Sequence, residues 1–152
     1  MQNKPDFLNA PIFFEKNRVG RVYTGGALFA DFFGDDSADG FEPEEWVASN
    51  VIALNKVPKS PKEGVSKIKG TDIYFDDLLR DYKQELLGNR KYDCLVKFLD
   101  SAVRLPFQVH PTKEFSRKHF NSDYGKTEAW LVVAKRPNAK LYFGFKDKIT
   151  KE

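Results

Sequence analysis

Short apolar runs that end at turn residues recur along the chain. Many of their residues are β-branched or aromatic, and Gly, Pro or Asn commonly follows, which is typical of strands. The pattern predicts strands over 45–51, 94–99, 103–111, 126–136 and 140–145, and a short one over 21–26 that ends at a Gly pair.

Two segments carry helical signals instead. Apolar residues from Ile73 to Leu87, with Thr71 or Asp72 as a cap and Gly88 as a stop, predict helical pieces over 71–88. Thr112 precedes a second segment, 113–120, which we expect to form one short helix.

Short strands with few helices between them predict a mainly β fold of the α+β class, an antiparallel sandwich or barrel rather than βαβ units. The sequence ends soon after the last expected strand, where a barrel still needs partners. We therefore expect residues 1–152 to be a single domain that forms part of a longer protein.

Composition narrows the class of protein. Fourteen Phe residues in 152 favour a β-rich core. The net charge of +3 comes from interspersed charges, so we expect no nucleic-acid partner. The lysines between Lys56 and Lys69 are either a solvated loop or a phosphate-binding patch.

One cysteine, Cys94, allows no intrachain disulfide, and we expect a buried, inert thiol. The first residues show no signal-peptide pattern, and no apolar run is long enough to cross a membrane. These features predict a cytoplasmic protein with no membrane partner.

Gln108 and His110 lie two apart in an expected strand, so both side chains leave the same face. Imidazole is a common zinc ligand, and a carboxylate such as Glu128 from a neighbouring strand is compatible with it. On spacing alone, such a pair is more often a surface or hydrogen-bonded pair than a metal site.

Longer motifs add to this spacing. Gln108-Val109-His110-Pro111, followed by Gly125-Lys126-Thr127-Glu128-Ala129-Trp130, is similar to the signature of the type I mannose-6-phosphate isomerases, which are cupins. The segments 95–100 and 45–49 also resemble parts of that family. The resemblance implies a cupin jelly-roll, incomplete here, of which this chain is the N-terminal portion.

The resemblance also implies roles for single residues. Gln108, His110 and Glu128 would bind Zn²⁺, with a fourth ligand, a second His, expected downstream. His119 does not match that position, and a surface role is favoured for it. Lys126 would act in catalysis, near the reacting carbons, and the alternative for it is a salt bridge to Glu128 or to a surface carboxylate.

Three further residues are candidate substrate contacts: Lys97, Trp46 and Ser49. For Trp46 and Ser49 a structural role, as a core aromatic and a satisfied hydroxyl, is the favoured interpretation. Lys97 either faces the pocket or extends from an edge strand into solvent.

The implied reaction is the interconversion of mannose 6-phosphate, or a related sugar phosphate, and fructose 6-phosphate through a cis-enediol. One position departs from the family: Pro106 stands where a phosphate-binding Ser is expected, and proline has no N–H to donate. The alternative is a non-catalytic, metal-containing sugar-binding or regulatory cupin. Self-association through an open sheet edge is a further expectation.

Overall fold

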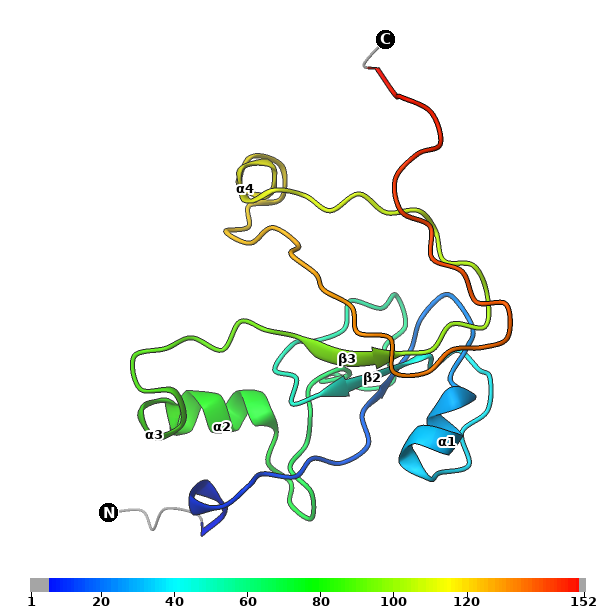
Figure 1. Cartoon of the computed structure of the whole chain (residues 1–152). Coiled ribbons are helices and arrows are strands. Elements are labelled where there is room, and N and C mark those ends of the chain that lie inside the picture. The colour runs from blue at the N-terminus through cyan, green and yellow to red at the C-terminus, as the bar shows by residue number, and fades with distance from the viewer. Residues whose placement is uncertain (1–5, 151–152) are drawn as a thin grey trace. The chain divides into compact units, whose positions relative to one another are not determined.

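The computed structural model describes residues 6–150 and divides into two compact units, Met1–Val103 and Arg104–Glu152. The expectation that they form one domain stays a prediction. The first unit contains most of the regular structure (Figure 1): η1 (Asp6–Asn9), β1 (Arg18–Val19), α1 (Leu28–Phe33), β2 (Glu44–Val47), α2 (Phe75–Asp81), α3 (Lys83–Leu87) and β3 (Val96–Leu99).

A three-stranded antiparallel sheet with the order β1-β2-β3 forms the centre of the first unit. Figure 1 shows β2 and β3 as its visible arrows. Trp46 of β2 is paired with Lys97 of β3, and Glu45 with Phe98. The strand expected over 45–51 is confirmed only as far as Val47, because Ala48 adopts a left-handed backbone with φ of 48°.

Two apolar clusters stabilise this unit. One places Ile68 against residues Phe75, Leu78 and Leu79 of α2. The other joins Val19, Trp46 and Ala53 from β1, β2 and the loop after β2. The first cluster buries one face of α2, and the second buries Trp46 of β2.

The helical pieces expected over 71–88 are confirmed as α2 and α3, which meet at Tyr82. Gly88 ends α3 as expected, with its N–H donated to Gln84 O at 3.0 Å. The expected caps are wrong, because the Thr71 hydroxyl accepts from Ile73 N in a local turn before α2 begins.

The short α1 was not expected from the sequence. Its first backbone N–H groups are bound by a distant carboxylate, since Asp100 Oδ2 accepts from Gly26 N at 3.0 Å and from Leu28 N at 2.9 Å. A Cβ atom at Gly25 would lie 1.8 Å from Asp100 O, so glycine is required there. Phe32 of α1 also packs on Phe98 of β3, at 4.8 Å between ring centroids.

The second unit contains α4 (Lys113–Phe120), which matches the helix expected from the sequence. The Thr112 hydroxyl caps it by accepting from Phe115 N at 3.2 Å. Asn121, with a left-handed φ of 50°, ends it. The local sequence therefore specifies both ends of this helix.

The strands expected over 103–111, 126–136 and 140–145 are wrong for the described part of the second unit, which contains no regular strand there. The short strand expected over 21–26 is also wrong, since β1 lies before it and residues 22–23 form a bend. A strand needs a neighbour that pairs with its N–H and C=O groups, and alternation in the sequence does not supply one.

Many apolar side chains of the second unit are exposed. They include Val109, Leu131 and Phe143, of which Val109 is 85% and Leu131 86% exposed.

The fold is mixed α+β with a small antiparallel sheet, and the cupin jelly-roll is not seen as a closed barrel among residues 6–150.

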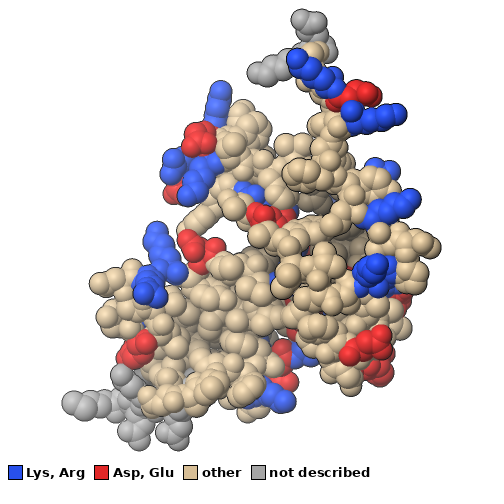
Figure 2. All heavy atoms as spheres, in the orientation of Figure 1, with Lys and Arg blue, Asp and Glu red and all other residues tan. Residues whose placement is uncertain are grey.

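Acidic and basic side chains are intermixed on the face shown in Figure 2, with broad uncharged areas between them. This agrees with the small net charge of +3. None of the helices in the described chain has the length and apolar character required to cross a bilayer.

Candidate metal centre

The candidate metal centre lies within the second unit, where two extended segments meet. Lys126 N donates to Pro111 O at 3.2 Å and so joins the segment that carries His110 to the segment that carries Glu128. Gly125 permits this approach, because a Cβ atom there would lie 2.8 Å from Pro111 O.

The side chains of these segments converge on each other. His110 Nε2 lies 3.3 Å from Glu128 Oε2. Lys126 Nζ lies 3.4 Å from the same Oε2 and 3.4 Å from Gln108 Oε1. All four residues that the sequence placed in this site are thus brought together, in a chain of contacts from Gln108 through Lys126 and Glu128 to His110.

The spacing of two of these groups suits one metal ion. With zinc–ligand bonds of about 2.1 Å in a tetrahedron, two ligand atoms lie about 3.4 Å apart. The distance between His110 Nε2 and Glu128 Oε2 is 3.3 Å. The imidazole and carboxylate are therefore spaced as adjacent corners of such a site would be, and Gln108 is linked to them through Lys126.

Within residues 6–150, no group of three or more His, Cys, Asp and Glu side chains is arranged to hold a metal ion. The donor set of this site contains only two residues of those types, His110 and Glu128. With the amide oxygen of Gln108, the sequence prediction names three donors, one fewer than a closed structural zinc site uses.

The remaining histidine lies outside this group. His119 is in α4 and stacks against Phe115, with 4.3 Å between ring centroids. Its place in the last turn of the helix, and this stacking, give it a local role.

The candidate substrate residues lie in the first unit. Trp46 is 4% exposed, and Ser49 is fully buried with its hydroxyl bonded to the Val51 backbone. Lys97 is the accessible member, with about a quarter of its side chain exposed (24%). Burial limits Trp46 and Ser49 to shaping the fold around any ligand.

A buried carboxylate that we did not expect links two of these residues. Glu44 Oε2 accepts from Trp46 Nε1 at 2.7 Å and pairs with Arg21 at 2.9 Å. Its Oε1 accepts from the Tyr23 hydroxyl at 2.6 Å and lies 3.4 Å from Lys97 Nζ. The alternation along β2 puts Glu44 and Trp46 on one face, and this signal could have identified the cluster.

The surroundings of Glu44 shift two pKa values. Burial opposes the charge on Glu44, but hydrogen bonds from Arg21, Tyr23 and Trp46 outweigh it and lower the carboxyl pKa below its usual 4.5. Burial is the largest cause that raises the pKa of Tyr23, and the hydrogen bond to Glu44 is the second. Glu44 is therefore a carboxylate and Tyr23 a neutral donor near neutral pH.

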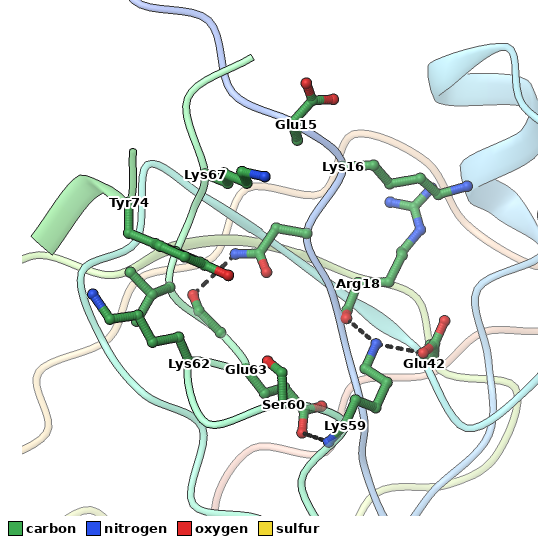
Figure 3. Close-up of a pocket in the computed structure, with 13 residues that line it drawn as sticks. Glu15, Lys16, Arg18, Glu42, Lys59, Ser60, Lys62, Glu63, Lys67 and Tyr74 are labelled. Carbon is green, nitrogen blue, oxygen red and sulfur yellow. Dashed lines mark hydrogen bonds and ion pairs between the residues drawn. The ribbon is translucent and has the colours of Figure 1, made fainter. Parts of the chain in front are cut away.

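The lysine-rich segment lines a cavity of about 400 Å³ in the first unit, which is shown in Figure 3. Three of its lysines, all lining the cavity, are paired within the protein: Lys59 with Glu42, Lys62 with Asp76 and Asp77, and Lys67 with Asp72. This pairing favours the first interpretation of the segment, a solvated loop, over a phosphate-binding patch.

Two other sequence expectations concern single residues. Cys94 is exposed, so the expected burial of its thiol is wrong. The residue lies just before β3, outside the part of the chain that pairs with β2. Pro106, at the position of the expected phosphate-binding serine, is exposed in the second unit.

Comparisons with known proteins show which ones this chain resembles. It is 29% identical over 138 residues to the probable mannose-6-phosphate isomerase GmuF of Bacillus subtilis. The matched region covers 88% of this chain and 41% of the relative. It is 28% identical over 148 residues to the mannose-6-phosphate isomerase of Streptococcus mutans, with 93% of this chain and 43% of the relative covered. The mannose-6-phosphate isomerase ManA of B. subtilis is 37% identical over 60 residues, 40% of this chain and 19% of the relative.

These matches confirm the resemblance inferred from the motifs. The chain spans about two-fifths of the length of the first two relatives. No protein-family model and no solved structure matched it.

Proposed function

Because this chain is related over most of its length to mannose-6-phosphate isomerases, we propose that the complete protein is a zinc-dependent aldose–ketose isomerase. Its substrates would be mannose 6-phosphate and fructose 6-phosphate, or a related sugar-phosphate pair. The observation that carries this proposal is the convergence of Gln108, His110, Glu128 and Lys126 in the second unit.

In this proposal Gln108, His110 and Glu128 hold the zinc ion, and a ligand outside residues 1–152 completes its coordination. Zinc, when bound, supplies Lewis-acid polarisation of the substrate carbonyl or hydroxyl. The cupin jelly-roll of the complete protein would bring that further ligand to the same site. The proposal therefore treats this chain as one part of the metal centre.

Lys126 has the position required for the electrostatic part of the reaction. Its ammonium group lies 3.4 Å from the carboxylate of a proposed metal ligand, and its side chain is about half exposed. A proton moves between C1 and C2 of the sugar through a cis-enediol, and negative charge develops on the adjacent oxygen. An ammonium group close to that oxygen would stabilise the charge.

Lys97 is the candidate for substrate binding in the first unit, since its ammonium reaches the surface while Glu44 holds it at 3.4 Å. Trp46 and Ser49 would act on the substrate only through the backbone and side chains that they support. A small phosphorylated sugar is the partner that this arrangement suggests.

A second candidate function rests on Pro106. A site without the serine hydroxyl loses one donor to the substrate phosphate, and proline has no N–H to replace it. A non-catalytic cupin that binds metal and a sugar is therefore the alternative to an isomerase.

A coupled assay for fructose 6-phosphate formation by the complete, zinc-loaded protein separates the two candidates. The isomerase proposal requires turnover that His110→Ala abolishes and His119→Ala retains, because only the first residue is placed at the metal. Zinc binding without turnover on mannose 6-phosphate or related aldose phosphates would favour the binding protein.

A further inference from the structure

Lys126 occupies the space between two of the proposed metal ligands. Its Nζ lies 3.4 Å from Gln108 Oε1 and 3.4 Å from Glu128 Oε2. An ammonium ion between two oxygen acceptors satisfies them much as a metal ion would. From this geometry we infer that Lys126 is the internal counter-cation of the metal-free site, and that metal binding displaces it.

The inference follows from the available space. A zinc ion bound about 2.1 Å from either oxygen would lie no farther than about 5.5 Å from Nζ at its present position, because Nζ is 3.4 Å from each oxygen. Two positive ions then share one pair of acceptors. The ammonium moves away when the metal enters, or metal affinity falls.

The size of this competition can be estimated for an ammonium that stays in its present position. Even with the dielectric constant of water, repulsion between a single and a double charge about 5.5 Å apart corresponds to about a tenfold loss of affinity at low salt. Because the interaction is electrostatic and the lysine is about half exposed (47%), added salt should weaken it.

The displaced ammonium has a use in the proposed reaction. Glu128 holds Lys126 in the metal-free site, and a metal ion that takes over the Glu128 oxygen leaves the lysine available to the substrate. Metal loading would thus also release the group that stabilises the developing oxyanion. This inference rests on the proposed metal site and assigns a second role to Lys126.

Calorimetric titration of Zn²⁺ into the 152-residue chain tests the inference without an activity measurement. Four variants are compared with the wild type: Lys126→Met, Lys126→Arg, the control Lys140→Met and His110→Ala. Lys140 is an exposed lysine of the same unit, so Lys140→Met removes the same charge away from these contacts. Lys126 is itself about half exposed, so its replacement should leave the fold intact.

We expect Lys126→Met to tighten Zn²⁺ binding by up to about tenfold at low salt, with a smaller gain at high salt, and Lys126→Arg and Lys140→Met to stay near wild type. If His110→Ala weakens binding but Lys126→Met leaves it unchanged or weaker, the lysine inference is overturned while the metal site stands. If His110→Ala has no effect, the metal site and the inference both fail.

Discussion

The hydroxyl of Tyr23 lies 2.6 Å from Glu44 Oε1, inside the first unit. This bond is one of several that a single buried carboxylate accepts, from a phenol, an indole and two cations. Such a cluster ties the loop before α1 to β2 and β3. Its stability depends on the charge at its centre, which leads to two predictions.

Replacement of Glu44 by Gln should lower the free energy of unfolding by about 3 kcal/mol, because partly buried cations lose their counter-charge. Urea denaturation measures the change. Glu42→Gln is the matched control, since Glu42 is about half exposed and pairs with Lys59 at the surface, and it should cost less than about 1 kcal/mol. Equal effects of the two substitutions would contradict the role given to Glu44.

The same carboxylate should make stability depend on pH. The folded-state pKa of Glu44 lies below its ordinary value of 4.5, so its contribution is fully present above that value and is lost as pH falls through the folded pKa. Unfolding free energies measured from about pH 6 to about pH 3 should fall more steeply for wild type than for Glu44→Gln. Tyr23→Phe removes a donor that lowers the Glu44 pKa, so in this variant the loss of stability should be smaller and should be complete at a higher pH.

Gly25→Ala should be strongly destabilising, by more than about 2 kcal/mol. A Cβ atom there would lie 1.8 Å from Asp100 O, and the backbone must shift to admit it. Gly40→Ala is the control, because nothing lies within 4 Å of a Cβ at Gly40, its bridge partner. Thermal unfolding of both variants measures the difference, and similar midpoints would show that the loop adapts.

The 152-residue chain should bind Zn²⁺ more weakly than the complete protein, by about tenfold or more, because it supplies three donors where zinc prefers four. Titration of both proteins under the same conditions measures the two affinities. Equal affinities would mean that this chain already holds the full coordination sphere, and the expectation of a downstream ligand would be wrong.

The chain should associate with itself through the outer edge of β3. Within the described residues β3 pairs only with β2, and Val96 on it is half exposed. Unpaired strand edges template association. Sedimentation velocity over a range of concentrations should show larger species, and Val96→Lys should reduce them. Val22→Lys, at an exposed position outside the strands, should leave them unchanged.

Local signals predicted the elements that local contacts specify. Thr112 and the four-residue spacing of Phe115 and His119 predicted α4, because its cap and its ring contact lie within the helix. The helix α1 has no such signal, since the carboxylate that binds its first turn is Asp100, 72 residues away from Leu28. A contact between residues so far apart in the sequence leaves no signal in the local sequence pattern.

The site was predicted better than the strands that were expected to carry it. Motifs identified Gln108, His110, Lys126 and Glu128, and the structure brings them together, although their roles remain proposals. Alternation near Val109 and Leu131 predicted strands, but a ladder requires partners that no alternation specifies. Glu44 was missed because the strand was expected to begin at residue 45, so the alternation that puts Glu44 and Trp46 on one face was not applied to it.

The contact of Lys126 with two ligand oxygens also affects the rate at which a metal ion enters. The Lys126 ammonium contacts an oxygen of Gln108 and an oxygen of Glu128, and so links two of the proposed ligands before a metal ion arrives. The donors then need no search for their geometry. The pace of metal entry would then be set by the departure of one flexible lysine side chain rather than by the gathering of the ligands.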